Sequence, residues 1–477
     1  MRLHSVLVYR ISGGSRALAL ASLMLIFAIC RPATALEVEI DFSRFTLDQA
    51  IGLALGHDEF LQQVQTEVEG AKGSLVAARS GQLPHLALTG QYARNLKKPA
   101  FFLPPEMGEA FGVSGPIPMG GDNDLLAAVK VTFNLWTAGR LSAAEGIASE
   151  MLMATRFRES AVADGVLFNT SVAYNDVLLA SENLQIAIQS LAAAEESRRV
   201  AEAGFNQGTL SNFDHLRARV EVANRQAPLI VARNDLAQSM LVLERRCGLR
   251  PATIVDLADS LGGVAPPADQ DSLVAEMIRG SSEIQALNHT VAAARQGVLL
   301  QKAGNKPMLL LSGDYALQGQ WDSGATPDDN EYATSSKVAL GLAFPIFDGK
   351  RTAGLTSRAS ADLRQVELEL ARVTRDKELA VRQAWMGLAN ALAALEGRTE
   401  AVILAEESYR LAVVRVTNGL ATPLERLDAE LALTSARVQQ AVVQYACNIA
   451  EANLALAVGN TSAPFLDETN SQEIENE

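Results

Sequence analysis

The chain has 477 residues and a formal net charge of −14 at pH 7, because 55 acidic side chains outnumber 41 basic ones. This balance argues against a nucleic-acid partner, which calls for a basic surface. Hydrophobic residues make up 48% of the chain but aromatic residues only 5%. Such a composition, rich in Ala, Leu and Val, suits long and closely packed helices better than a thick globular core.

The first 35 residues have the features of a secretory signal peptide. Three arginines precede an apolar stretch from Ala17 to Cys30, which is too short for an ordinary membrane span. Ala33-Thr34-Ala35 offers a cleavage site, so we expect an exported mature chain that starts near Leu36; an uncleaved anchor is the alternative. Cys30 follows Ile29, where a lipoprotein needs a small residue, so a non-acylated protein is favoured.

Beyond this segment, the sequence repeats itself at a spacing of 211 residues. Residues 194–201, Ala-Glu-Glu-Ser-Arg-Arg-Val-Ala, return at 405–412 as Ala-Glu-Glu-Ser-Tyr-Arg-Leu-Ala. The same shift relates Phe133 to Phe344 and Gly208 to Gly419. One unit has therefore been duplicated. We predict a first repeat at 36–249, a linker at 250–271, a second repeat at 272–460 and a disordered acidic tail at 461–477.

Each repeat is predicted to contain a helix, two strands, a very long helix, a sharp turn and a returning helix. The first helix runs from about Thr46 to Gly81, and Pro84 separates it from the first strand. The later elements of the first repeat are strands at 85–94 and 125–136, a helix at 140–204, a tip turn at 205–210 and a helix at 211–249. Those of the second repeat are strands at 308–318 and 334–346, a helix at 351–415, a tip turn at 416–421 and a helix at 422–459.

The strands alternate between apolar and more polar positions, with Leu86, Leu88 and Tyr92 on one side of the first. Runs of about ten residues are long enough for a tilted strand to cross a bilayer. A soluble hairpin with one buried face is equally compatible. No later stretch has 18 consecutive apolar residues, so entry into a membrane would require strands in a closed barrel. Tyr92, Tyr315 and Trp136 are candidates for aromatic girdles or for packing between strands.

The two long helices are the strongest structural signal. The segments from Arg140 to Gly204 and from Arg351 to about Arg415 contain no Pro and little Gly, which predicts helices of about 95 Å. The first and last helices of a copy together nearly match the long one in length. We therefore expect a cylinder wall in which long helices lie alongside pairs of shorter ones.

Four short motifs carry a resemblance to a known family. The strand-to-helix junctions, 133–140 and 344–351, are Phe-Asn-Leu-Trp-Thr-Ala-Gly-Arg and Phe-Pro-Ile-Phe-Asp-Gly-Lys-Arg. The helical tips, 204–208 and 415–419, are Gly-Phe-Asn-Gln-Gly and Arg-Val-Thr-Asn-Gly. In this order, duplicated with strands and long helices, they make the chain resemble the TolC family of outer-membrane channel proteins over about 45–460.

The resemblance implies an α+β membrane protein. Each chain would supply four transmembrane β-strands, three chains would close a twelve-stranded barrel, and the helices would form a long α-helical barrel through the periplasm. Four strands cannot close a membrane barrel alone, so oligomerisation is required if they lie in the membrane. The implied location is the cell outer membrane, in contact with its lipid and extending into the periplasm.

The implied function is that of a passive exit duct, gated at its periplasmic tip, for a tripartite efflux pump or a type I secretion system. Its partners would be two further copies of the chain, a periplasmic membrane-fusion adaptor and an inner-membrane pump of the ABC or RND type. The pump would largely set the cargo. A soluble periplasmic helical scaffold without transport activity is the alternative.

By the same resemblance, Glu425 and Asp428 would line the periplasmic constriction. They lie three apart on one helix face. Three chains would stack two rings of carboxylates, which favour cations and raise one another's pKa by repulsion. The alternative is a solvated acidic pair that stabilises the helix N-terminus, where Thr422 and Glu425 form a capping box.

Asp214 matches a family acid that helps to hold the closed tip through bonds to the second tip; a free surface acid is the alternative. The sequence departs from the family here, with Val416 in place of an aromatic residue and Ala421 in place of a basic one. Arg415 or Arg426 is then the candidate partner of Asp214 in the gate.

Gly208 and Gly419 are predicted to shape the two tips and so to affect adaptor docking. Their neighbours are candidate adaptor contacts: Asn206, Thr209, Leu210, Asn418 and Leu420.

No enzyme, cofactor or metal site is expected, because the five histidines are scattered and no phosphate-binding loop or nucleophile elbow occurs. Cys247 and Cys447 are 200 residues apart and do not occupy equivalent positions in the repeats. We expect both to be buried apolar residues rather than disulfide partners.

Overall fold

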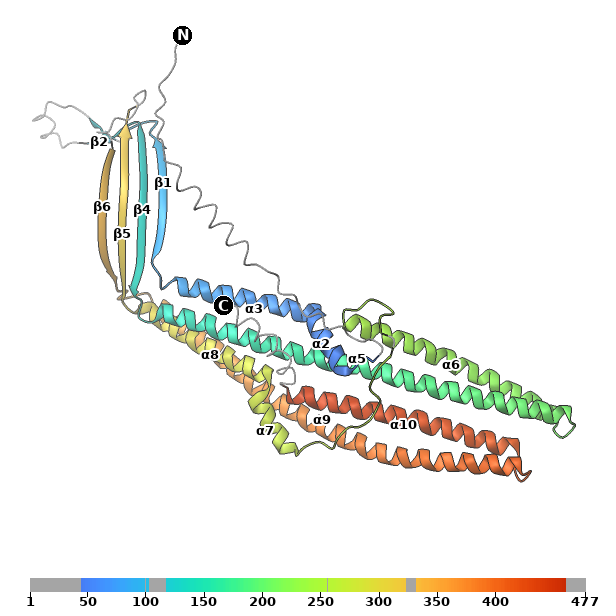
Figure 1. Ribbon diagram of the computed structural model, residues 1–477. Helices are drawn as coiled ribbons and strands as arrows, with labels where there is room; N and C mark the ends of the chain where they lie inside the picture. The colour runs from blue at the N-terminus through green and yellow to red at the C-terminus, as the bar shows by residue number, and fades with distance from the viewer. Residues whose placement is uncertain (1–43, 99, 103–116, 255, 323–331, 460–477) are drawn as a thin grey trace, which may run out of the picture. The chain divides into compact units, whose positions relative to one another are not determined.

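The structure is a computed structural model that describes residues 44–98, 100–102, 117–254, 256–322 and 332–459. These residues all belong to one compact unit. The expected signal peptide, 1–35, and the expected tail, 461–477, lie outside the described residues. In Figure 1 a four-stranded sheet leads into a bundle of long helices.

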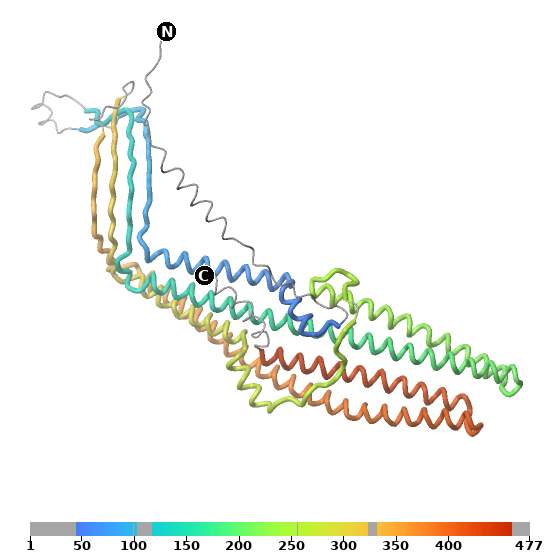
Figure 2. Tube along the Cα trace, viewed as in Figure 1, coloured from blue at the N-terminus to red at the C-terminus, as the bar shows by residue number. Residues whose placement is uncertain are grey.

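The sheet is antiparallel and joins the two repeats. Its strands are β1 (His85–Arg94), β4 (Asn123–Trp136), β5 (Met308–Trp321) and β6 (Tyr332–Ala343). Their order is β1-β4-β5-β6, so the central pair, β4 with β5, takes one strand from each repeat. β1 and β6 are the two edges, as the trace in Figure 2 shows. Each edge strand has a neighbour on one side alone among the described strands.

The register gives this sheet one apolar face and one polar face, because directly paired residues lie on the same side. Leu88, Val129 and Tyr315 form one row of the apolar face. Other members of that face are Leu86, Val131, Leu317, Val338, Leu340 and Leu342. The polar face includes Thr89, Gln91, Lys130, Thr132, Ser312, Asp314, Gln318, Ser335 and Lys337. Leu88 is 79% exposed and Val338 80% exposed, so nothing in the described chain covers the apolar face.

Strand boundaries differ from the sequence prediction at several ends. β6 runs from Tyr332 to Ala343 instead of 334–346, and Pro345 cannot donate a ladder hydrogen bond beyond it. β4 begins at Asn123 rather than 125, and β5 continues to Trp321 rather than 318. These two extensions pair with each other, since Asn123 lies opposite Trp321. A short ribbon of β2 (Ala100–Phe101) and β3 (Ile117–Pro118) lies in the loop between β1 and β4.

Two helical hairpins make up most of the chain. α5 (Arg140–Asn206) and α9 (Arg351–Thr417) have 67 residues each, and each continues two residues beyond its predicted end. At 1.5 Å per residue these helices are about 100 Å long. α6 (Asn212–Arg246) packs along α5, and α10 (Pro423–Val458) packs along α9. Figure 1 shows both hairpin turns at the end of the helices farthest from the sheet.

The first helix of each repeat is broken, so the prediction of one helix from Thr46 to Gly81 is wrong. α2 (Leu47–His57) and α3 (Glu59–Ser80) meet at Asp58. Its extended backbone, with ψ 118°, ends α2, and its side chain accepts a hydrogen bond from Leu61 N at 2.9 Å to begin α3. α7 (Gln270–Gly280) and α8 (Ser282–Lys302) meet at Ser281, whose backbone is also extended, with ψ 118°, but whose side chain makes no cap hydrogen bond. A 3₁₀ turn, η1 (Ala303–Asn305), follows.

The linker between the repeats is held against the first of them by polar contacts. Glu244 is 1% exposed, and its carboxylate accepts hydrogen bonds from the backbone N–H groups of residues 252, 253 and 254 at 3.0, 2.7 and 3.1 Å. The Tyr174 hydroxyl donates to Asp259 Oδ2 at 2.7 Å. These bonds help to fix the path of the linker.

The core lies between helices. α7, α9 and α10 meet in an apolar cluster that includes Met277, Val381 and Leu388, all at most 2% exposed. Cys247 and Cys447 are buried and unpaired, which confirms the prediction that they are packing residues.

Two helices, α5 and α10, each contain an 18-residue window that is apolar enough to cross a membrane, with mean hydropathies of 1.2 and 1.3. A core helix of a bundle meets the same criterion of length and composition. α5 packs against α3, α6 and α8, and α10 packs against α9 and α5, although only 28% of each window is buried within the single chain.

Candidate functional site

The first hairpin turn is held by its own backbone. α5 ends at Asn206, and Gly208 has φ +75°, a conformation that residues with a Cβ rarely adopt. The N–H groups of Thr209 and Leu210 both donate to Gly204 O, at 2.9 and 3.2 Å. A Cβ on Gly204 would lie 2.7 Å from Leu210 Cδ1, so Leu210 packs back onto its own hairpin. Asn206 and Thr209 remain exposed candidates for a partner contact.

The second hairpin turn has the same design. Gly419 has φ +72°, and Leu420 N donates to Arg415 O at 2.8 Å. Asn418 Nδ2 donates to Val414 O at 2.8 Å, which directs its side chain back along α9. Leu420 is 71% exposed. Among the candidate adaptor contacts, it is the apolar side chain that a partner could cover most completely.

Asp214 is engaged within its own hairpin. Its N–H donates to Ser211 Oγ at 3.2 Å, and the Ser211 hydroxyl donates to Asp214 Oδ2 at 2.6 Å. This arrangement caps the N-terminus of α6. The predicted arginine partners lie elsewhere, because Arg415 is next to Glu425 and Arg426 donates to Ser197 Oγ. Within one described chain, neither arginine pairs with Asp214.

Glu425 has a structural role at the start of α10. Its Oε1 accepts the Thr422 N–H at 3.4 Å, and its own N–H donates to Thr422 Oγ1 at 3.4 Å, which completes the predicted capping box. Its Oε2 lies 3.4 Å from Arg415 Nη2. Asp428 is exposed one turn further along the same face. The two predicted constriction residues therefore lie one turn apart at the start of α10, and the Arg415 guanidinium lies beside Glu425.

The sequence analysis missed a buried acid close to these residues. Glu430 is 4% exposed, and neither of its carboxylate oxygens has a hydrogen-bond partner within the described chain. Burial raises the pKa of Glu430; Arg225 and Arg426 oppose this shift, and Glu221 adds to it. Arg225 is itself paired with Glu221 at 2.7 Å. No pattern in the sequence distinguishes Glu430 from the exposed acids around it, because only the packing of the two hairpins buries it.

Polar contacts connect the two hairpins along α5 and α10. Their pairs are Arg426 with Ser197, Arg437 with Gln189 at 2.9 Å, and Tyr445 with Asp176 at 2.8 Å. Burial, together with the hydrogen bond to Asp176, raises the pKa of Tyr445 to about 12. The two hairpins can therefore separate near their tips only if bonds of this kind are broken.

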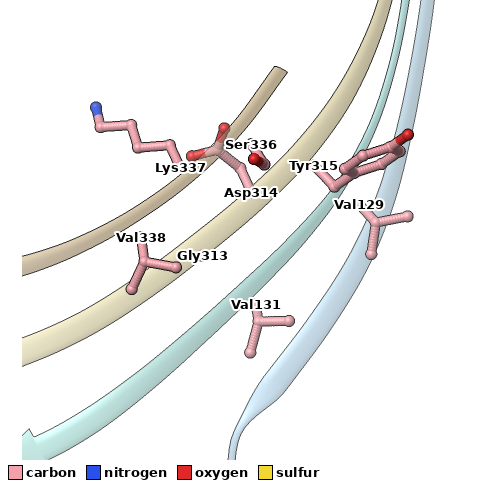
Figure 3. A pocket seen from close by; sticks show the side chains of 8 residues that line it. All are labelled: Val129, Val131, Gly313, Asp314, Tyr315, Ser336, Lys337 and Val338. Atoms are coloured by element: carbon pink, nitrogen blue, oxygen red, sulfur yellow. The ribbon is translucent and has the colours of Figure 1, made fainter. Parts of the chain in front are cut away.

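The sheet provides a second candidate surface. A shallow hollow of about 270 Å³ opens beside Gly313 (Figure 3). It is lined by apolar residues and three polar ones: Val129, Val131, Gly313, Tyr315 and Val338, with Asp314, Ser336 and Lys337. It exists because Gly313 has no side chain in a row of larger apolar residues.

Aromatic residues mark the ends of the apolar face. At the end near the β2–β3 ribbon, the Trp321 ring lies 6.2 Å from Tyr92 and 6.5 Å from Tyr332, measured between centroids. Trp136 lies at the opposite end of β4 and is 51% exposed. Tyr315 is near the middle of β5, so its position does not suit a girdle. The strand alternation would have found Trp321 and Tyr332 had the expected strands been long enough to include them.

An uncovered apolar sheet face, bounded by aromatic residues and continued by helices of 67 residues, defines the class of outer-membrane channels with a long helical extension. The sequence profile of the outer membrane efflux protein family matches residues 50–249 and 273–460. The chain belongs to this family.

Similar proteins extend over nearly the whole chain. The toluene efflux pump outer membrane protein TtgF of Pseudomonas putida is 24% identical over 425 residues, which cover 86% of this chain and 83% of TtgF. The cobalt-zinc-cadmium resistance protein CzcC of Cupriavidus metallidurans is 23% identical over 430 residues, 88% of this chain and 93% of CzcC. The crystal structure of the CmeC outer membrane channel of Campylobacter jejuni matches the fold with a TM-score of 0.70 at 14% identity, over 88% of each chain.

The chain is thus an outer-membrane efflux channel protein that extends into the periplasm. The four-stranded sheet and the helical hairpins are the two parts that the resemblance predicted. The alternative of a soluble helical scaffold has no support from these relatives.

Proposed function

We propose that the protein is a homotrimer in which three four-stranded sheets close one twelve-stranded barrel. The observation that carries this proposal is the sheet itself: among the described residues, β1 and β6 each have one unpaired edge and the apolar face is uncovered. Free strand edges cannot face lipid, since their N–H and C=O groups would lack partners there. Pairing β6 of one chain with β1 of the next satisfies both edges at once. A strand of 12 residues such as β6, tilted by about 40°, spans about 31 Å, enough for the apolar band of about 25 Å.

The trimer would serve as the passive exit duct of a tripartite efflux pump or type I secretion system. In this role a periplasmic adaptor and an inner-membrane pump of the ABC or RND type supply the energy and the choice of cargo, and the chain performs no chemical step of its own. TtgF is named for toluene and CzcC for cobalt, zinc and cadmium. Such different cargoes on one fold favour a duct whose own walls select weakly.

Cell fractionation of the full-length protein tests the assembly. Detergent-resistant trimers in the outer-membrane fraction are expected. A soluble periplasmic monomer would exclude both the barrel and the duct.

Docking at the tips can be tested with a photo-crosslinking amino acid. Placed at Leu420, which is 71% exposed at the second tip, it should capture the adaptor. The matched control is Leu368, which is 54% exposed but lies far from the tip along α9. Equal capture from the two positions, or capture from Leu368 alone, would contradict docking at the tips.

The constriction at Glu425 and Asp428 is part of the proposal. Three chains would bring six carboxylates together at the tip, and these should favour cations. Because Glu425 also caps α10, the variant Glu425→Gln, Asp428→Asn is preferable to alanine: glutamine can keep the hydrogen bond to Thr422 N while losing its charge. The cation preference of single channels in planar bilayers should fall. Glu59→Gln, which removes an exposed acid from α3, is the control. An unchanged preference in the double variant would remove these residues from the constriction.

A further inference from the structure

The interior of the four strands contains only three charged residues. They are Lys130 in β4, Asp314 in β5 and Lys337 in β6, and the other acidic, basic and histidine residues of these strands, His85, Arg94 and Asp124, lie within one residue of a strand end. A charged side chain in the middle of a membrane strand is costly unless it faces water. Their presence therefore needs an explanation.

The register places all three in one row. Lys130 lies directly opposite Asp314, and Asp314 lies directly opposite Lys337. Residues paired in this way share one face of the sheet. In Figure 3 the Asp314 and Lys337 side chains lie next to each other on adjacent strands. The row is near mid-height, since Asp314 is the seventh of 14 residues in β5 and Lys337 the sixth of 12 in β6.

The row belongs to the polar face, together with Thr132, Ser312 and Ser335. The rows on either side of it, which include Val129 with Tyr315 and Val131 with Gly313, belong to the apolar face. If the apolar face contacts lipid, the row must point into the lumen of the barrel. A lysine on the lipid side near the midplane would cost about 2–4 kcal/mol.

We propose that Lys130, Asp314 and Lys337 form a positively charged ring in the barrel lumen, which favours anionic permeants in the membrane part of the duct. This inference rests on the proposed trimeric barrel. Two lysines against one aspartate leave one net positive charge per chain and three per trimer. The ring lies at the far end of the duct from the acidic tip, so the two ends select for opposite charge.

The size of the effect follows from the barrel radius. Twelve strands spaced about 4.8 Å apart and tilted by about 40° give a radius of about 12 Å. Three unit charges at this distance, with a Debye length of about 10 Å in 0.1 M salt, change the anion-to-cation ratio on the axis by about threefold. In 0.01 M salt, where the Debye length is about 30 Å, the change is about tenfold.

A thiol beside the ring can report this potential without interference from the tip. Ser335→Cys lies two residues from Lys337 on the same face. The native Cys247 and Cys447 are buried, so they should contribute little background. Membrane-embedded trimers are treated with anionic ethylsulfonate or cationic ethyltrimethylammonium methanethiosulfonate, and each rate is divided by its rate with a free thiol. The anionic reagent should be favoured by about threefold in 0.1 M salt and by more in 0.01 M salt.

Charge variants give the decisive comparison. When Lys130→Gln and Lys337→Gln are added to the Ser335→Cys protein, the ring retains only the three copies of Asp314. The preference should then reverse to about threefold in favour of the cationic reagent. Adding Asp314→Asn should instead increase the anionic preference. Equal rate ratios in all three backgrounds would overturn the ring.

The orientation has its own control. Ser336→Cys is on the apolar face, next to Ser335, and should not react in the membrane. Reaction at residue 336 with protection at residue 335 would place the row outside the lumen and would also overturn the proposal. If no trimers reach the membrane fraction, the proposed barrel fails instead, so the two failures are distinguishable.

Discussion

The orientation of the sheet can be tested by placing a lysine at two neighbouring positions of β6, one on each face of the sheet. Val338 is on the apolar face and is 80% exposed in the single chain, whereas Ala339 is on the polar face. Both lie near the middle of β6. Val338→Lys would place an ammonium group in lipid, and Ala339→Lys would place the same group in the water of the lumen.

In the proposed trimer the expected difference is large, because each substitution is present three times. A lysine on the lipid face near the midplane costs about 2–4 kcal/mol, so three copies cost about 6–12 kcal/mol. This equals much of the typical stability of a folded protein, about 5–15 kcal/mol. At position 339, the main cost is repulsion by Lys337, about 0.6 kcal/mol for charges about 7 Å apart in water.

Trimer yield in the outer membrane and the urea midpoint of purified trimers measure the effect. Val338→Lys should abolish or strongly reduce detergent-resistant trimers, and Ala339→Lys should leave them close to the parent level. Equal loss in both variants would refute the assignment of the faces, and a greater loss for Ala339→Lys would reverse it.

Three further predictions concern the helices. Glu430→Gln should raise the melting temperature at pH 7 by removing a buried carboxylate that lacks hydrogen bonds. Because burial raises the folded-state pKa of Glu430, its contribution to stability is present at low pH and is lost as pH rises through that pKa. Melting temperatures measured between about pH 4 and 8 should therefore depend less on pH in the variant than in the parent protein. Glu244→Ala leaves the buried Ile254 N–H without its acceptor and should cost about 1–3 kcal/mol, seen as a lower melting temperature and faster proteolysis of the linker. In Gly419→Ala the added Cβ meets no atom within 4 Å, but alanine must adopt φ +72°, which costs about 1–2 kcal/mol. Amide hydrogen exchange at the second tip should accelerate by the corresponding factor. The acceleration should be smaller for Gly419→Asn, because asparagine tolerates this conformation better.

Much of the fold could be predicted because its signals are local and repeated. The helices α5 and α9 follow from long stretches without Pro, and their ends follow from Gly208 and Gly419. The breaks at Asp58 and Ser281 were missed, although Asp and Ser are residue types that favour helix N-caps; of the two, Asp58 makes a side-chain cap hydrogen bond. A helix-breaking turn of one residue leaves the surrounding composition unchanged, so composition alone predicts a continuous helix.

At the second tip, the helix cap was predicted from the sequence, but the other contacts of the candidate gate residues were not. The capping box of Thr422 and Glu425 depends on residues three apart, and the sequence contains all the information it needs. The ion pair of Arg415 with Glu425 and the burial of Glu430 depend on how a hairpin folds back and on how two hairpins pack. These are long-range consequences of the bundle that no spacing in the sequence expresses.

The repeat helps to locate the gate, because equivalent positions share structure but not every charge. Asp214 and Glu425 are 211 residues apart, and both occupy the same capping position of their returning helices. The charges that act across helices fall where the copies differ: Arg415 corresponds to Gly204, Glu430 to Arg219 and Arg225 to Ala436. The shared residues build two similar hairpins, and these differences decide how each hairpin contacts its neighbours. A gate needs such asymmetry, since contacts that differ between the hairpins allow one of them to move while the other stays in place. The cluster of Glu430 and Arg225, together with the pair Arg415–Glu425, is therefore where opening should be sought first.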